Sequence, residues 1–294
     1  MSVSESTSLG RRVGKWLAIA MLAGLGLIAL TAAVLAPLRP SNDRNWVPEH
    51  ARVPHAVFEG RRVRVENVRN FHHIAPGRFQ PAFEDRTYDL DRLESAWFVL
   101  TPFGKKWRGP AHSFVSFGFR GDSTARGVKP PEFVSISVEA RRERGETYGA
   151  LAGLLRRFEL LYVVGDERDL IGLRAVINGD VTELYPVSAR PERIRQMFVA
   201  MLERANALRE RPEFYNTATS NCTSNLVEHV NAIAPHTVPY GIKTILPGYA
   251  DEVARAVGLI DSTLPVSEAR QRYRVNERAK AAWGRSDFSL AIRR

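Results

Sequence analysis

The chain has 294 residues, of which 44% are hydrophobic and 25% charged, which is typical of a globular protein and excludes a disordered one. Its formal net charge is +10, and a balance this basic is usual in proteins that bind membrane surfaces or nucleic acids. No zinc-finger, helix-turn-helix or RNA-binding motif accompanies the charge, so we expect no nucleic-acid partner. The single cysteine, Cys222, excludes an internal disulfide.

An uncharged apolar run occupies residues 16–38, WLAIAMLAGLGLIALTAAVLAPL. Its length suits a helix across a bilayer core, and it exceeds the apolar region of about 7–15 residues that is usual in a signal peptide. Cleavage before Pro37 would be unfavourable, so we expect an uncleaved anchor. The basic residues flanking the run number three before it and two after it, namely Arg11, Arg12 and Lys15, then Arg39 and Arg44. The positive-inside rule therefore predicts a cytoplasmic segment 1–15 and a body outside the cytoplasm.

Composition divides the body into three parts. Residues 39–60 are rich in Pro, Asn and charge and predict a linker. Residues 61–261 alternate between strand and helix patterns and predict one domain of the α+β class. Residues 262–294 are basic and poor in large apolar residues, so they predict a tail or a surface helix. Because the body remains basic without the anchor, we expect it to be attracted to an anionic membrane surface.

Two segments alternate cleanly and predict neighbouring antiparallel strands, His112–Phe119 and Phe133–Arg141. Pairing their apolar faces sets Val115 opposite Ile136, because a slip by one residue would place every apolar residue against a polar one. The same register places His112 beside Glu139. Cross-strand neighbours lie about 4.5–5.5 Å apart at Cβ, close enough for the carboxylate to hold the imidazole ring. An ordinary surface pair is the alternative.

Three further segments predict helices. Apolar residues recur at helical spacing in Glu146–Glu159, as Tyr148, Leu151, Leu154, Leu155 and Phe158. Asp169 is predicted to cap a helix that runs to Ile177. Pro191 and the segment Arg193–Arg211 predict the longest helix of the body.

The stretch FYNTATSNCTSNLVEHV, residues 214–230, contains the only cysteine. Leu226, Val227 and Val230 recur at helical spacing, which predicts a helix from about Thr223 with residues suited to N-capping just before it. Cys222 then lies at a helix N-terminus, where exposed N–H groups and the macrodipole favour the thiolate. The alternative is a small buried residue that begins a helix.

Cysteine catalysis requires a thiolate, a base and a group that orients the base. Cys222, His112 and Glu139 can supply these three roles. His229 lies two turns along the predicted helix, too far for direct contact, and His236 has no evident carboxylate beside it. His72 and His73 leave a metal-dependent hydrolase as an alternative, although no HExxH or CxxC motif accompanies them.

The order of a histidine on a strand followed by Asn-Cys at a helix start resembles permuted papain-like, NlpC-like and lecithin:retinol-acyltransferase-like enzymes. A closer resemblance covers about residues 97–247, in the blocks WFVLTPFG, HSFVSFGF, SISVEARRERGE, FELLYVVGDERDLIGLR and FYNTATSNCTSNL. By these blocks the chain resembles the Lnb N-terminal periplasmic domain family. The family's namesake is a bacterial lipoprotein N-acyltransferase that carries further membrane helices after this domain.

This resemblance implies a permuted papain-like (NlpC-like) antiparallel sheet packed with helices, preceded by one transmembrane helix. It implies a thioester acyl-enzyme on Cys222, with His112 as the base and Glu139 as its orienter, in a bacterial inner membrane. The acyl substrate is a lipid, a lipoprotein or an amide, and no cofactor or metal is expected. Tyr215, Asn216 and Asn221 are candidates for lining the site. The alternative function is a non-catalytic, membrane-tethered binding module.

Overall fold

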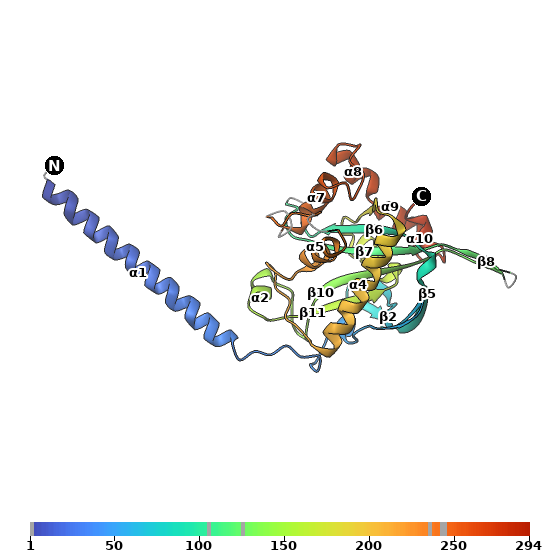
Figure 1. The fold of residues 1–294 in the computed structure, drawn as a ribbon, viewed down its shortest axis with the longest axis horizontal. Helices are drawn as coiled ribbons and strands as arrows, with labels where there is room; N and C mark the ends of the chain where they lie inside the picture. The colour runs from blue at the N-terminus through green and yellow to red at the C-terminus, as the bar shows by residue number, and fades with distance from the viewer. Residues whose placement is uncertain (1–2, 105–106, 125–126, 235–236, 242–245) are drawn as a thin grey trace. The chain divides into compact units, whose positions relative to one another are not determined.

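The computed structural model describes residues 3–104, 107–124, 127–234, 237–241 and 246–294 (Figure 1). The chain forms two units, residues 1–40 and residues 41–294. The first unit consists of helix α1 (Val3–Leu35). Its segment Gly14–Leu35 is long and apolar enough to cross a membrane, by length and composition. An apolar N-terminal helix was predicted for this region, and the structure confirms it.

The second unit is organised around one mixed sheet with the strand order β1-β2-β11-β10-β7-β6-β12, in which β5 also pairs with β2. Neighbouring strands are antiparallel, except that β11 lies parallel to β2. The strands are β1 (His55–Glu59), β2 (Arg62–Arg69), β5 (Phe83–Asp89), β6 (Leu93–Pro102), β7 (Ala111–Phe119), β10 (Glu132–Arg141), β11 (Glu159–Gly165) and β12 (Glu183–Pro186). Two small hairpins flank the sheet, β3 (His72–Ala75) with β4 (Arg78–Gln80), and β8 (Asp122–Thr124) with β9 (Gly127–Lys129).

The predicted register of the two central strands is confirmed. Val115 on β7 pairs with Ile136 on β10, and Phe117 pairs with Val134. The apolar faces of the two strands match, because a slip by one residue would place buried apolar side chains opposite polar ones.

Helices cover both faces of this sheet. Helix α4 (Pro191–Glu210) lies across one face, together with α5 (Cys222–Ile233) (Figure 1). The other face packs against α3 (Glu167–Gly172), the π-helical turn η3 (Leu173–Asn178), α9 (Asn276–Ala282) and α10 (Phe288–Ala291). Each face of the sheet therefore has its own hydrophobic core. On strand β11, Tyr162 points into the core beneath α4 and α5, and its neighbour Leu161 points into the core on the other face. The chain is therefore an α+β protein, as predicted.

Of the segment 39–60, predicted as a linker, residues 41–60 belong to the folded unit. They contain a short 3₁₀ turn, η1 (Pro48–His50), and strand β1. Trp46 and His50 are buried, and the Arg141 guanidinium lies 4.0 Å from the centre of a Trp46 ring. The polar composition misled the prediction because a few large side chains suffice to anchor a short segment.

The predicted helix Glu146–Glu159 is wrong over most of its length. Only α2 (Ala150–Leu154) is helical, and Glu159 opens β11. Gly145 and Arg156 have positive φ values of 85° and 56°, which a helix does not tolerate. The predicted apolar stripe therefore does not face the core, and most of its side chains are exposed.

The predicted cap at Asp169 is also wrong, because Asp166 caps α3 by accepting the Arg168 N–H. Asp169 is instead completely buried and accepts hydrogen bonds from Arg69 and from the N–H of Phe71. A buried carboxylate with these partners joins α3 to β2 and to the start of the β3 hairpin.

Residues 262–294 form no extended tail. After η4 (Pro247–Tyr249) and α7 (Ala250–Ala256), helix α8 (Val266–Tyr273) leads into α9 and α10. Helices α9 and α10 and their flanking residues contribute buried side chains to the core on that face of the sheet, namely Val275, Ala279, Ala282, Phe288 and Ile292. The segment looked poor in core residues because two of these five are small alanines and the others are widely spaced among polar residues.

Candidate active site

Cys222 is the first residue of α5, as the sequence predicted. Asn221 caps the helix, because its Oδ1 accepts the N–H groups of Thr223 and Ser224, both at 2.9 Å. Ser224 Oγ accepts the Asn221 N–H at 2.8 Å and completes a capping box. The cap uses two N–H groups of the first turn and does not engage that of Cys222. The thiol itself is buried, with 4% of the residue exposed.

The predicted pair of His112 and Glu139 is formed. His112 Nε2 lies 3.0 Å from Glu139 Oε1 and 2.7 Å from Ser137 Oγ. Ser137 Oγ donates to the same carboxylate oxygen at 2.7 Å, so one consistent arrangement has Nε2–H directed at both groups. Nδ1 is then the ring nitrogen available to the thiol.

Sequence reasoning missed Ser137 and Arg174. Ser137 could have been found from the predicted strand. Residues two apart lie on the same face of a strand, and Ser137 is two residues before Glu139. Arg174 Nη2 lies 3.9 Å from Glu139 Oε1 and comes from the π-helical turn η3. The sequence predicted a helix over this stretch, but its pattern did not indicate that Arg174 would lie beside Glu139.

The pKa shifts of these side chains favour a thiolate beside an imidazolium. Burial alone would raise the pKa of the Cys222 thiol, but hydrogen bonding to His112, the charge of His112 and contacts from Ser113 hold it below its usual value. Burial alone would lower the pKa of His112, but the Glu139 carboxylate outweighs it and raises that pKa. Burial alone would raise the pKa of Glu139, but His112 holds it well below the usual range.

A second contact fixes the start of α5 against β7. Ser113 Oγ and Thr223 Oγ1 are 2.9 Å apart, and Cys222 Sγ lies 3.9 Å from Thr223 Oγ1. These groups flank the thiol, with Ser113 next to His112 in the strand and Thr223 next to Cys222 in the helix. The contact therefore holds the histidine strand and the cysteine helix in register.

The three candidate lining residues have different surroundings. Tyr215 is buried, and its pKa is raised by burial and then by the negative charge of Cys222. Asn216 Oδ1 accepts the N–H groups of Ala218 and Thr219, within its own loop. Asn221 also contacts backbone, because its Nδ2 donates to Thr217 O at 2.8 Å in addition to the cap.

The other histidines that the structure describes lie in separate environments. His73 Nε2 lies 2.7 Å from Asp169 Oδ1 in a buried pair, and His229 Nε2 lies 2.8 Å from the Tyr162 hydroxyl. His236 lies outside the described residues. Within the described ranges, no three His, Cys, Asp or Glu side chains gather as a metal site requires.

The basic loop between β6 and β7 is described only in part, because Lys105 and Lys106 lie outside the described residues. Arg108 forms two hydrogen bonds with the buried carboxylate of Glu183, at 3.0 and 2.8 Å. The charge of Arg108 is therefore paired with a carboxylate of the same chain.

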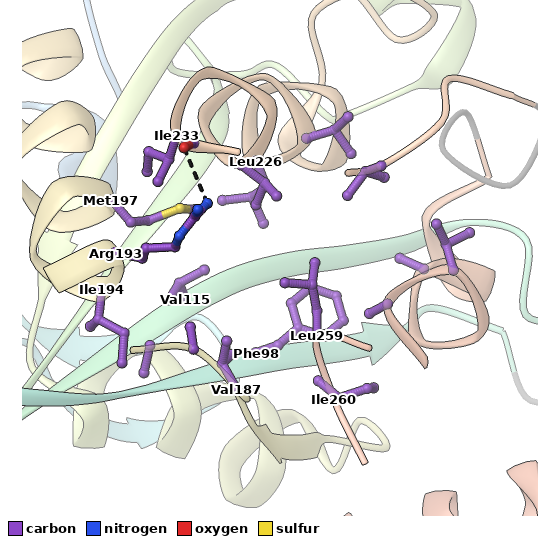
Figure 2. Close-up of a pocket in the computed structure, with 18 of the residues that line it drawn as sticks. Phe98, Val115, Val187, Arg193, Ile194, Met197, Leu226, Ile233, Leu259 and Ile260 are labelled. Atoms are coloured by element: carbon purple, nitrogen blue, oxygen red, sulfur yellow. Dashed lines mark hydrogen bonds between the residues drawn. The ribbon is translucent and has the colours of Figure 1, made fainter. Parts of the chain in front are cut away.

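An apolar cavity of about 150 Å³ runs along the cysteine helix (Figure 2). Thr223 and Leu226 of α5 line it, with Val115 and Phe98 from the strands opposite. Arg193 is the one charged residue among the described residues that line it, and its Nη1 donates to Ile233 O at 3.2 Å (Figure 2). The remaining lining residues are Ala96, Val187, Ala189, Ile194, Met197, Val227, Val230, Ile233, Val238, Ala250, Val253, Ala254, Leu259 and Ile260. An apolar lining of this kind favours the binding of an apolar group.

Comparison with known proteins agrees with the resemblance seen in the sequence. The family model described as the Lnb N-terminal periplasmic domain matches residues 79–248, which is more than half of the chain. A search of curated proteins and a search of solved structures found no match. The matched segment includes β7, β10 and the start of α5, which carry His112, Glu139 and Cys222. The chain therefore belongs to the Lnb N-terminal periplasmic domain family.

Proposed function

We propose that this chain is a membrane-anchored cysteine acyltransferase or hydrolase that forms a thioester on Cys222, on a fold of the permuted papain-like (NlpC-like) type. One observation carries the proposal. The buried Cys222 thiol lies at a capped helix start, His112 lowers the pKa of that thiol, and His112 Nε2 lies 3.0 Å from Glu139 Oε1. That arrangement supplies a nucleophile, a base and an orienter in contact with one another.

The chemistry follows from these positions. The Cys222 thiolate attacks the acyl carbonyl, and the Cys222 N–H, which the Asn221 cap leaves unused, stabilises the oxyanion. Protonated His112 then gives its proton to the departing alcohol or amine as the carbonyl–heteroatom bond breaks. In the second half, neutral His112 removes a proton from water or an amine, which attacks the thioester and releases the thiolate. Glu139 and Ser137 orient the ring throughout.

The cavity along α5 favours a substrate with a long acyl chain over a peptide amide. Thr223, the residue after the nucleophile, lines it, and the other described lining residues are apolar except for Arg193. Burial of each methylene of a chain there contributes about 0.8 kcal/mol. A lipid or a lipoprotein is therefore the proposed acyl donor. The apolar helix α1 and the periplasmic family place the protein as a single-pass membrane or periplasmic protein, and we propose a cytoplasmic N-terminus in a bacterial inner membrane.

Trapping of the acyl-enzyme tests the proposal. The purified full-length chain in detergent is incubated with a p-nitrophenyl ester, quenched in acid and weighed intact. We expect one added acyl group, removed by neutral hydroxylamine as a thioester is, and none on the Cys222→Ala variant. An acyl group that remains after hydroxylamine, or that appears equally on Cys222→Ala, would show that the thiol is not the nucleophile.

A second candidate function is a binding module without catalysis. The burial of Cys222 favours it, because only 4% of the residue is exposed and inert structural cysteines are commonly buried. This candidate predicts that maleimide fails to label Cys222 in the folded protein and that no acyl-enzyme forms.

Filling the cavity is expected to alter chain-length preference. Ala254 on α7 lines the cavity, whereas Ala256 on the same helix is exposed and does not. We expect Ala254→Phe to lower the rate of acylation by a dodecanoyl ester relative to an acetyl ester by at least about tenfold, with Ala256→Phe as the matched control. An equal loss with both esters, or no loss with either, would place the acyl chain elsewhere.

A further inference from the structure

A short stretch before β11 exposes large apolar side chains that the core does not use. Of the ten large apolar side chains exposed in the described part of residues 41–294, four lie within residues 148–155. Leu151 is 70% exposed, and the other three are Tyr148, Leu154 and Leu155. Scattered exposed apolar residues are normal, but a contiguous group of this kind marks an interaction surface. We call residues 148–157 the α2 segment.

Chain connectivity limits how far the α2 segment lies from the end of the anchor. Helix α1 ends at Leu35, and the Ser41 N–H already bonds to Glu159 Oε1 at 3.2 Å. Six residues span about 20 Å at most when fully extended. Glu159 follows the α2 segment almost directly in the chain, so a spanning α1 keeps this segment near the membrane surface.

The α2 segment also combines apolar and basic residues in a pattern typical of a membrane interface. Arg156 and Arg157 follow the exposed leucines directly, and both are exposed. Arg157 Nε lies 2.6 Å from Glu146 Oε1, at the segment's edge. Leucines flanked by arginines, with a tyrosine at the margin, suit the boundary between headgroups and acyl chains of an anionic bilayer.

The segment contacts the loop that leads into the nucleophile. Thr217 Oγ1 donates to Ala150 O at 2.8 Å, and the hydroxyls of Tyr148 and Tyr215 are 3.4 Å apart. A Cβ at Gly153 would clash with Thr217 Oγ1, so the two segments approach closely. The surface that carries the exposed leucines is therefore continuous with the surroundings of Cys222.

We propose that the α2 segment docks the folded unit onto the anionic bilayer, with Leu151, Leu154 and Leu155 inserted at the level where headgroups meet acyl chains. Docking there brings the Cys222 loop to the lipid surface. The proposal concerns a binding surface and holds whether or not Cys222 is a nucleophile.

Depth-dependent fluorescence quenching tests this placement in the full-length chain. Because Cys222 is the only cysteine, a Cys222→Ser background allows one label at Leu151→Cys, and Leu155→Cys repeats the measurement. Each variant carries the fluorophore NBD and is reconstituted in vesicles of phosphatidylcholine and phosphatidylglycerol. Val128→Cys is the matched control, because Val128 is 79% exposed on the β8–β9 hairpin, at the opposite end of the folded unit from α2 (Figure 1).

We expect lipids with a doxyl group near the headgroup to quench the label at Leu151 at least twofold more than the label at Val128. Iodide in the water should quench in the reverse order, and vesicles of phosphatidylcholine alone should weaken the doxyl effect. A Leu151 label open to iodide and unaffected by doxyl lipids would overturn the proposal. A label shielded from both quenchers would also overturn it, because the segment would then contact protein.

Discussion

Replacement of His112 by Gln is expected to slow alkylation of Cys222 at pH 6 by at least about tenfold, because each unit of pKa changes the thiolate fraction tenfold below that pKa. His112 opposes the effect of burial on the thiol, so its removal raises the pKa of Cys222. The wild-type rate of reaction with iodoacetamide should therefore reach half its maximum below the ordinary thiol pKa of about 8.5, and that of His112→Gln above it. Acylation should fall by about 10²–10⁴-fold, as expected for loss of a general base.

The matched control for this variant is His229→Gln. His229 is also mostly buried and also bonds a side chain, the Tyr162 hydroxyl at 2.8 Å, but it lies two turns along α5 from the thiol. We expect its alkylation profile to match that of the wild type. Coincident profiles for wild type and His112→Gln would show that the imidazole does not hold the thiolate.

An Asp169→Ala substitution is expected to lower the free energy of unfolding by about 3–5 kcal/mol, because it leaves a buried cation without its partner. Asp169 accepts bonds from Arg69 at 2.8 and 3.0 Å and from the Phe71 N–H at 3.0 Å, and all its side chain is buried. Urea unfolding of the detergent-solubilised chain, followed by tryptophan fluorescence, measures the change.

The contribution of the Asp169 carboxylate to the free energy of unfolding depends on pH. Burial alone would raise the pKa of Asp169, but the Arg69 charge and the bonds from His73 and Phe71 lower it. Its contribution to stability is therefore present above the unfolded pKa of about 3.9 and is lost as the pH falls through the lower folded value. Asp91→Ala is the control, because Asp91 pairs with Arg61 at the exposed surface and exposed pairs contribute little. Equal destabilisation by both substitutions would show that the buried Asp169–Arg69 pair stabilises the fold no more than the exposed Asp91–Arg61 pair.

The part of the site that lies on regular elements was predictable from the sequence. Alternation along two strands fixed the pairing of Val115 with Ile136, and continuing that register brought His112 beside Glu139. The capping residue Asn221 located the helix start and therefore Cys222. These features depend on the alternation of apolar residues and on a helix-capping residue, and both can be identified in a single sequence.

The part that depends on contacts distant in sequence was not predictable. The apolar spacing in residues 146–159 suggested a helix because periodicity alone does not reveal a left-handed residue such as Arg156. Arg174 lies 3.9 Å from Glu139 and comes from η3, a π-helical turn that is distant from Glu139 in the sequence. The cavity along α5 is also lined by residues from two strands and two further helices. These elements are distant in the sequence, so no local pattern predicts that they lie together.

The isolation of Cys222 has a consequence for its oxidation. The thiol has no second cysteine in the chain with which to form a disulfide, and the family is periplasmic, where thiols are readily oxidised. A sulfenic acid formed on Cys222 therefore has no resolving cysteine within its own chain, and further oxidation to the sulfinic acid is irreversible in most proteins. Recovery of the thiol after a first oxidation would depend on a reductant supplied from outside the protein.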